Sequence, residues 1–427
     1  MEYPKILMIR QDVDAPKVPD IPRAIQDIFY KLHLGSAIKP GARVAITAGS
    51  RGVRDMVSVI REIVRNLKLI GAVPFVAPAM GSHGGATDEG QTEVLESLGI
   101  NRETIDAPIL SSMETDDIGQ NKYGASVLIG SDFTRADHVI VLNRIKAHTD
   151  FKGNIESGLY KIMMIGMGKH AGAALAHRLI LKHGFEEVVT NLGKIILSKV
   201  PVVAGVGIVE NHYDETAIID GFLPNDILSG EMRLLRESKR MMARIPFDDV
   251  DVLIVDEMGK AISGTGMDTN VINRIFHQAT PEPSPQQFKR IYVRDLTEDT
   301  HGNAIGIGLA DFTSTRLVSK IDFHKMRVNC VTGTTPEKGR VPLAYDRDDD
   351  AIADAIYNAG VINTKYARLA WIKNTLELEH LYISHAIWDS VADKGKFQLI
   401  LPESPLPFDA EGNLPFGMFD KKTAQVR

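Results

Sequence analysis

The residue types best suited to chemistry gather in the first half of the chain, in short polar segments that follow apolar runs. The first of these segments is Ser50-Arg51-Gly52-Val53-Arg54, directly after the apolar run 43–47. Two arginines beside the free backbone amides of a helix start attract anions. We therefore expect phosphate or carboxylate binding here; the alternative is a plain strand-to-helix turn with solvated arginines.

Two histidines lie in polar loops rather than on apolar helix faces. His83 stands among the glycines of 81–85, after the run 73–77, and His148 follows the run 137–142. Imidazole titrates near neutral pH, and loops after strands often carry catalytic groups. Both histidines are therefore candidates for proton transfer, although a lone histidine can also be structural.

Lys161 opens the apolar run 161–168, where burial would lower the pKa of its amine. Such a lysine can be nucleophilic or covalently modified, but spacing alone favours a lysine that reaches solvent from a helix start. The glycines of 166–168 lack the third glycine and the acid of a dinucleotide fingerprint, so we reject that interpretation. His170 and His177 could share one helical face, yet their spacing does not match a two-histidine zinc helix.

The second half holds one dense polar run, residues 259–270, after the apolar run 250–257. Its glycines, hydroxyls and acid are typical of a ligand loop, but it does not match the P-loop pattern. His301 and His324 have no interpretable spacing, and we expect them on the solvated surface.

The elements that must position these residues alternate between strand and helix. Near-continuous apolar runs of β-branched residues predict buried strands, and amphipathic patterns over 55–70 and 225–244 predict helices. This alternation predicts an α/β fold with largely parallel sheets. The composition changes over 240–250, so we place a domain boundary there and predict domains 1–245 and 246–427.

Composition excludes several classes of protein. The 427 residues carry a net charge of −6, which predicts no nucleic-acid partner and no attraction to anionic membranes. A single cysteine, Cys330, excludes a disulfide framework and a thiolate metal site. The N-terminus lacks the apolar run of a signal peptide, and no stretch is long enough to span a membrane. We expect a cytoplasmic protein, and a homo-oligomer is compatible with this sequence.

Three segments in order resemble the lactate racemase family, whose members use a nickel-pincer nucleotide. They are GSHGGATDEGQTEVLESLG (81–99), AHTDFKGNIESGLYK (147–161) and the glycine-bearing stretch that ends at His177. The resemblance covers the first half well and the second half loosely. It implies two α/β domains of the lactate-racemase type with a cleft between them.

The resemblance also implies roles for individual residues. His83 and His148 correspond to paired general bases, Lys161 to the lysine that carries the cofactor through a thioamide, and His177 to the nickel ligand. The remaining implied contacts are Ser50, Arg54 and Ser157 with the cofactor, and Arg51, Asp268 and Asn270 with the substrate.

The chain departs from the family pattern at two places. The interval between His148 and Lys161 is longer than in the family, so Lys152 competes for the covalent role, although Ser157-Gly158 favours Lys161. Arg51 stands where lactate racemases tend to have an acid, which suggests an unusual substrate.

The implied function is racemisation or epimerisation of a 2-hydroxy acid through a 2-keto acid, with hydride passing to the nickel-pincer nucleotide. The implied partners are the hydroxy acid and the enzymes that build the cofactor. One alternative is a non-catalytic ligand-binding or sensor protein on the same scaffold. Another is a related isomerase or redox enzyme that acts on a larger hydroxy acid.

Overall fold

The computed structural model describes residues 2–278 and 280–419, and the chain divides into two compact units. The N-terminal unit is Ala15–Met242; the C-terminal unit begins at Ala243 and also contains the residues up to Asp14. The division after Met242 lies close to the predicted boundary. The first residues differ from the prediction, because their strand pairs with strands from the end of the chain.

The N-terminal unit is built on a five-stranded sheet that is parallel except for its last strand. In spatial order the strands are β3 (Val73–Pro78), β2 (Arg43–Ala48), β6 (His138–Arg144), β7 (Val202–Glu210) and β8 (Thr216–Phe222). The chain runs from β2 to β3 on one side and later to β6 on the other side. The strand order therefore reverses between β2 and β6, the place where open α/β sheets bind ligands.

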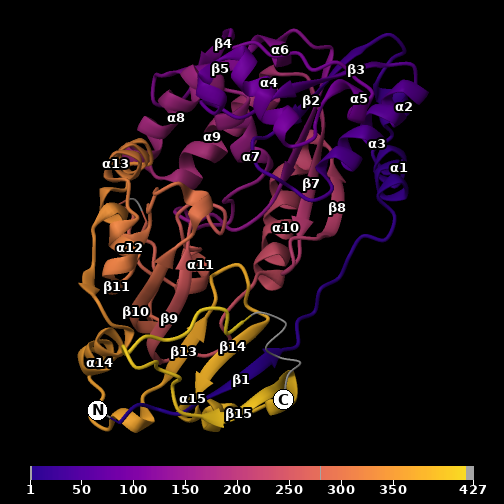
Figure 1. The fold of residues 1–427 in the computed structure, drawn as a ribbon. Helices are drawn as coiled ribbons and strands as arrows, with labels where there is room; N and C mark the ends of the chain where they lie inside the picture. Colours follow the sequence, from indigo (N-terminus) through magenta and orange to yellow (C-terminus); the bar gives the residue numbers. More distant parts are fainter. Residues whose placement is uncertain (1, 279, 420–427) are drawn as a thin grey trace. The chain divides into compact units, whose positions relative to one another are not determined.

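Helices cover both faces of this sheet (Figure 1). They are α1 (Ile21–Lys31), α2 (Leu34–Ala37), α3 (Met56–Leu69), α4 (Asp88–Ser97), α5 (Arg102–Ile105), α7 (Leu159–Lys161), α8 (Lys169–His183), α9 (Phe185–Lys199) and α10 (Ile227–Met241). Alternate side chains of a strand point to opposite faces. Val44 and Ile46 of β2 accordingly pack with α1 and α3, whereas Ala45 packs with α9 and α10.

A smaller hairpin completes the N-terminal unit. It consists of β4 (Thr115–Gln120) and β5 (Ser126–Gly130), which pair antiparallel and lead into α6 (Ser131–Thr134). Buried Lys169, the first residue of α8, donates a hydrogen bond to the carbonyl of Pro78 at 2.8 Å and pairs with Asp132 at 3.6 Å. This lysine joins the hairpin region to the end of β3.

The C-terminal unit has an eight-stranded mixed sheet. Its order is β12 (Leu343–Tyr345), β11 (Phe312–Ser314), β10 (Phe288–Leu296), β9 (Val250–Met258), β13 (Leu369–Ile372), β14 (His380–Ser384), β1 (Ile6–Gln11) and β15 (Phe397–Ser404). The first five strands are parallel, and β1 runs antiparallel to both β14 and β15. Figure 1 shows indigo β1 among these yellow strands.

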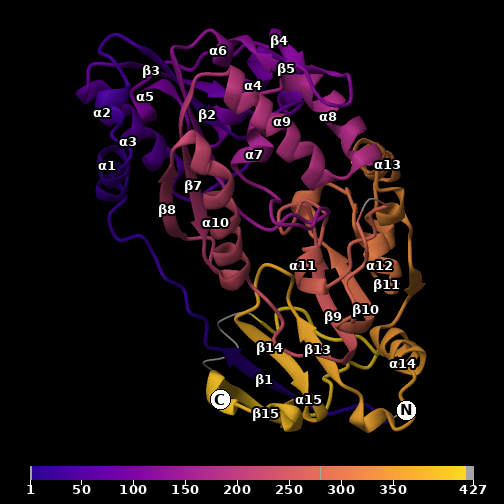
Figure 2. The ribbon, with the colours of Figure 1, turned by 180° about the vertical axis from the view of Figure 1, so that it is seen from behind.

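The helices of the C-terminal unit pack on this sheet, as Figure 2 shows from behind. They are α11 (Thr269–Ile272), α12 (Thr315–Ser319), α13 (Phe323–Thr332), α14 (Asp348–Asn358) and α15 (His385–Ser390). Two cores result, one on each face of the sheet. The predicted α/β class with largely parallel sheets is confirmed.

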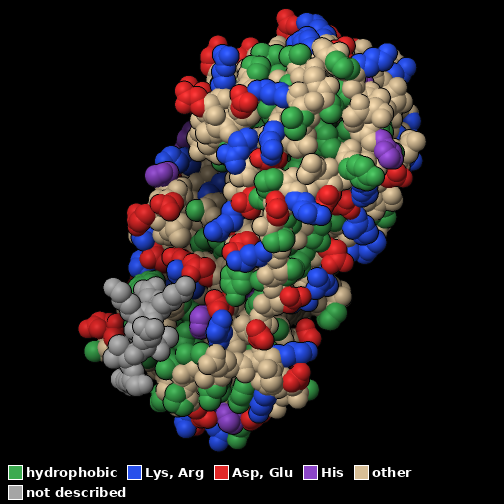
Figure 3. Space-filling model, turned by 90° about the vertical axis from the view of Figure 1, so that its right-hand side faces the viewer, with side chains coloured by type: hydrophobic (Ala, Val, Ile, Leu, Met, Phe, Trp, Pro, Cys, Tyr) green, Lys and Arg blue, Asp and Glu red, His purple; other side chains and the backbone are tan. Residues whose placement is uncertain are grey.

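The surface and the helices bear on two further predictions. The face drawn in Figure 3 mixes acidic and basic side chains, in line with a net charge of −6. Within the described residues, no helix is long and apolar enough to cross a membrane. The predicted location in the cytoplasm stays a prediction.

Candidate functional site

Four loops of the N-terminal unit start at the same edge of its sheet. Strands β3, β2, β6 and β7 are parallel neighbours, so their carboxyl ends lie side by side. Ser50 and Arg51 follow β2, His83 follows β3, and His148 follows β6. The topology therefore gathers the polar segments that the sequence singled out.

The His83 loop is held by its own side chains and by a close approach of two glycines. Thr87 accepts a hydrogen bond from the amide of Gly90 at 3.0 Å and caps α4. Buried Gln91 donates to the carbonyl of Gly81 at 2.9 Å. Gly84 has a φ of +64° and its Cα lies against Gly90, so a side chain there would collide. The loop brings the His83 ring Nδ1 into contact with Ser50 Oγ.

The His148 loop is closed at its base by paired main-chain hydrogen bonds between Lys146 and Ser157, 2.9 and 3.2 Å long. Inside the loop, the buried Glu156 carboxylate accepts hydrogen bonds from the amides of His148 at 2.7 Å and Gly153 at 3.2 Å. Lys239 of α10 pairs with the same carboxylate at 2.6 Å. These interactions therefore hold the loop in one defined conformation.

Two more contacts fix His148 within this loop. Lys152 Nζ donates to the carbonyl of His148 at 2.6 Å. The imidazole stacks on Phe151 with ring centroids 4.8 Å apart, and Phe151 stacks in turn on Phe185 of α9 at 4.5 Å. Lys152 thus supports the loop, which leaves Lys161 as the better candidate for a covalent role.

Lys161 lies at the end of the short helix α7, whose start is held from two sides. Asn143 at the end of β6 donates to the carbonyl of Gly158 at 2.9 Å. Buried Glu231 of α10 accepts from the amide of Tyr160 at 2.8 Å. A Cβ at position 158 would collide with the Glu231 carboxylate, so this position requires glycine.

Helix α7 continues as a π-helix over Ile162–Gly166, followed by a turn and then α8. Lys169 has a φ of +52°, which interrupts the helical path at the first residue of α8. π-turns are rare in proteins, but those that occur often lie at functional sites. Here the π-turn and the break lie between Lys161 and His177.

The electrostatics of this segment favour an uncharged amine. Burial lowers the pKa of Lys161 to about 8, the Asp150 carboxylate opposes this shift, and the charges of Arg51 and Lys146 add to it. Among the described residues, Lys161 Nζ has no hydrogen bond and no ion pair. The ring of His177 reaches solvent, yet burial by neighbouring atoms and the charge of Lys161 lower its pKa. Lys161 and His177 are therefore electrostatic neighbours.

Basic side chains surround this pair. Arg144 at the end of β6 is neutralised by Glu210 at the end of β7, and Glu210 also accepts from the amide of Arg54 at 3.0 Å. Burial and the charge of Arg144 lower the pKa of Arg51. Within the described part of the chain, the guanidinium of Arg51 has no acidic partner. The site thus offers positive charge, and the predicted binding of an anion by this segment stays a prediction.

The predicted substrate residues of the second half lie in the C-terminal unit. Asp268 caps α11 by accepting from the amide of Asn270 at 2.9 Å, and the Asn270 side chain donates to the same oxygen at 2.8 Å. Their predicted contact with substrate stays a prediction. Arg274, which follows them in the sequence, is buried in an ion pair with Asp311 at 2.8 Å, which gives it a structural role.

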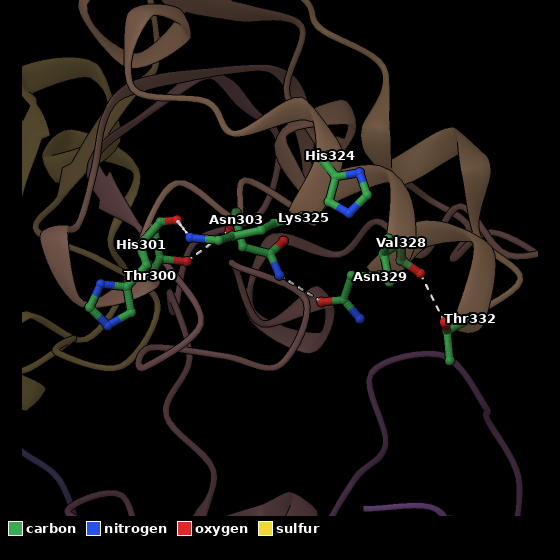
Figure 4. Close-up of a pocket in the computed structure, with 8 residues that line it drawn as sticks. All are labelled: Thr300, His301, Asn303, His324, Lys325, Val328, Asn329 and Thr332. Atoms are coloured by element: carbon green, nitrogen blue, oxygen red, sulfur yellow. Dashed lines mark hydrogen bonds between the residues drawn. The ribbon is translucent and has the colours of Figure 1, made fainter. Parts of the chain in front are cut away.

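The C-terminal unit also contains a pocket of about 550 Å³ (Figure 4). His301 and His324, which we expected on the solvated surface, lie on its rim. Its polar groups bind one another: Lys325 donates to the carbonyl of His301 at 2.9 Å, and Asn303 donates to Asn329 at 3.0 Å. The lining is Thr300, His301, Asn303, His324, Lys325, Val328, Asn329 and Thr332. We assign it no role in the chemistry of the N-terminal unit.

Sequence reasoning missed two acids of the site. Glu210 could have been found from its place at the carboxyl end of a buried strand, whereas Glu231 lies in an ordinary amphipathic helix and gives no such signal. Among the described residues, no group of three or more His, Cys, Asp or Glu side chains could hold a metal ion. His177 is a single imidazole, so a metal there would need its other ligands from a bound molecule.

Comparisons with known proteins agree with the resemblance. Residues 8–188 match the family model of the lactate racemase N-terminal domain. No curated protein sequence gives a significant match. A structure of the lactate racemase apoprotein from Thermoanaerobacterium thermosaccharolyticum is similar, with a TM-score of 0.52 and 11% identity over 86% of this chain and 94% of that chain. At this identity, the likeness shows the fold alone.

Proposed function

Because the domain match and the shared fold support the lactate racemase family, we propose that this chain is a racemase or epimerase of a 2-hydroxy acid. The observation that carries the proposal is Lys161, whose amine is withdrawn from water and has a pKa lowered to about 8 at the carboxyl edge of the sheet. An amine of this kind is partly neutral at physiological pH and able to form a covalent bond.

The residues around Lys161 fit a nickel-pincer nucleotide. Lys161 offers the amine for a thioamide, His177 offers one imidazole to nickel, and Ser50, Arg54 and Ser157 are the proposed contacts of the nucleotide. Guanidinium groups suit its phosphate, because they form charge-assisted hydrogen bonds. When bound, this cofactor would supply the acceptor and donor for the hydrogen on the substrate carbon.

The protein's own part in the reaction is to bind the acid and to move the hydroxyl proton. We propose that Arg51 binds the substrate carboxylate, because its guanidinium has no acidic partner within the described residues. Asp268 and Asn270 stay proposed substrate contacts. His83 and His148 are proposed to face the substrate oxygen, as the acid–base pair that the family resemblance implies.

Arg51 also supports a second candidate, a related isomerase or redox reaction on a larger or more acidic hydroxy acid. The extra positive charge that it brings beside Arg144 would favour a substrate with additional anionic or polar groups. The proposed partners are therefore a small 2-hydroxy acid and the enzymes that build the cofactor.

The test is to co-express the chain with cofactor-building enzymes and to assay a panel of 2-hydroxy acids, diacids and sugar acids by chiral chromatography. We expect added mass on Lys161, about one nickel per chain, and racemisation or epimerisation of at least one acid. An unchanged mass without nickel would favour the alternative of a ligand-binding or sensor protein. Added mass with a redox product instead of a stereoisomer would favour the second candidate.

A further inference from the structure

The Nδ1 atom of the His148 imidazole is bound by the residue's own loop. His148 Nδ1 accepts hydrogen bonds from the amides of Asp150 at 2.9 Å and Phe151 at 3.3 Å. An amide N–H can donate only to a ring nitrogen that carries a lone pair. The proton of the neutral ring is therefore on Nε2, and a second proton at Nδ1 would oppose two N–H groups.

Several contacts besides these two hydrogen bonds hold His148 in this conformation. Glu156 holds the amide of His148, Lys152 holds its carbonyl, and Phe151 holds the face of its ring. Lys239 of α10 fixes the Glu156 carboxylate. Opening the turn so that Nδ1 could accept a proton would disturb all of these contacts together.

His83 has a different partner. Its Nδ1 contacts the hydroxyl of Ser50, which can either donate or accept a hydrogen bond by rotating. When the hydroxyl accepts from Nδ1–H, the lone pair is on Nε2, and a proton can be taken up there. The same contact then stabilises the charged ring, because an imidazolium donates from both nitrogens.

We infer that the two histidines do different work: His83 exchanges the proton of the substrate hydroxyl, and His148 stays neutral and donates an Nε2–H hydrogen bond to a substrate oxygen. This inference rests on the proposed function. It departs from the two equal bases that the family resemblance implies. The proton passes from the substrate hydroxyl to His83 Nε2 and returns by the same path, so no proton is gained or lost at His148.

One consequence concerns inversion. With a single proton-exchanging group, the planar 2-keto acid must turn about its carbon–oxygen bond before the hydrogen returns to carbon. That turn exchanges the positions of the carboxylate and the side chain and leaves the oxygen at His83. The Nε2–H of His148 and the guanidinium of Arg51 would bind the acid in either orientation.

Charged groups near His148 come from three elements. Its own loop contributes Asp150, Lys152 and Glu156, α10 contributes Lys239, and α9 contributes Glu186, which accepts from the amide of Asn154 at 3.2 Å. A change in the protonation of His148 would therefore also change the electrostatic environment of these groups.

The first test is independent of activity. In protein with ¹⁵N-labelled histidine, long-range ¹H–¹⁵N correlation spectra distinguish the two neutral tautomers and the charged ring. We expect His148 to keep a proton on Nε2 alone from about pH 6 to 8, while His83 takes up a second proton within or near this range. A proton on Nδ1 of His148 at pH 7 overturns the inference, whatever the protein catalyses.

The second test uses side chains that mimic one ring nitrogen each. His148→Gln places an amide N–H near the position of Nε2 but cannot accept a proton, and His148→Asn places one near Nδ1. In nickel-loaded enzyme we expect a loss of about tenfold in kcat for His148→Gln and of about a hundredfold or more for His148→Asn and His148→Ala. The matched variant His83→Gln should lose about 10² to 10⁴.

Equal losses in His148→Gln and His148→Ala would overturn the donor role, because a base cannot be replaced by an amide. If no hydroxy acid is converted by the loaded wild type, the proposed function fails. The spectra of the unmodified protein then still decide the tautomer of His148 separately.

Discussion

Arg294 in the C-terminal unit and Lys161 in the N-terminal unit are both cations withdrawn from water, but their surroundings differ. Arg294 is fully buried and donates to Asp348 at 2.9 Å, pairs with Asp256, and lies over the ring of Phe416 at 4.4 Å. Asp348 and Asp256 receive further hydrogen bonds from Tyr292 and Trp371. Each charge in this cluster is compensated within the unit.

Lys161 has no such compensation. Asp150 acts on it only at longer range, Arg51 and Lys146 repel it, and no described residue forms an ion pair with it. A buried charge without a partner destabilises a fold, so it persists where function requires it. The Arg294 cluster therefore stabilises the fold, whereas the surroundings of Lys161 are typical of a ligand-binding site. Three predictions test this difference.

The largest expected effect follows from replacing Lys161 with methionine. Lys161→Met should lose cofactor mass and racemisation together, by about a thousandfold or more in rate, because the proposed attachment is gone. The same variant should unfold at a higher denaturant concentration than the wild type near pH 7, since an unpaired charge is removed. Intact mass, chiral assay and urea unfolding measure the three quantities.

The control for this variant is Lys152→Met, which should keep the cofactor mass. The reverse result, with mass lost in Lys152→Met and kept in Lys161→Met, would assign the covalent role to Lys152. The pH dependence gives an internal check. Between about pH 8 and 10.5 the unfolded chain holds the proton of Lys161 more tightly, so wild-type stability should rise with pH, and this rise should be absent in Lys161→Met.

The second prediction concerns the compensated cluster. Arg294→Met should lower the free energy of unfolding by about 3–5 kcal/mol, because Asp256 and Asp348 are left buried without their cation. Arg347→Met is the matched control in the same unit. Arg347 is half exposed and pairs with Asp349, so its loss should cost less than about 1 kcal/mol. Equal effects of the two variants, measured by urea unfolding, would remove the distinction drawn between the clusters.

The smallest expected effect comes from Glu231, a buried acid that no cation pairs with among the described residues. Burial raises its pKa to about 8, whereas its ordinary value is 4.5. The folded protein therefore keeps this proton up to about pH 8, while the unfolded chain releases it above about 4.5. Wild-type stability should fall as pH rises between these values, by on the order of 2–4 kcal/mol.

Glu231→Gln should remove this fall, because a glutamine can still accept from the amide of Tyr160 and does not ionise. Urea unfolding at pH 5, 6, 7 and 8 compares the two proteins. Parallel curves would mean that another group causes the pH dependence. The variant should also keep Lys161 available for modification, since the start of α7 remains held.

The sequence predicts much of the fold because its buried strands are short apolar runs. The runs 43–47, 73–77 and 137–142 became β2, β3 and β6, and the predicted helix over 55–70 became α3. Strand β1 could not be assigned to the second unit. Its partners lie more than 300 residues away, and only tertiary pairing shows that Ile6 lies opposite Ser384.

The site was predictable in outline for the same reason. Polar loops after parallel strands must meet at one edge of a sheet, which brings Ser50, His83 and His148 to one side. The sequence cannot show which ring nitrogen of His148 accepts a hydrogen bond, because that depends on the turn at Asp150 and Phe151. Nor can it show that Glu231 lies beneath the start of α7, since its helix pattern is ordinary.

The place of β1 between β14 and β15 has a consequence for how the protein is made. This strand leaves the ribosome before the whole N-terminal unit, and its two neighbours follow only after that unit. All strands of the N-terminal unit lie within residues 43–222, so that unit can complete its sheet while synthesis continues. The C-terminal unit must wait for β14 and β15, and until then β1 is an unpaired strand that cellular chaperones would have reason to shield.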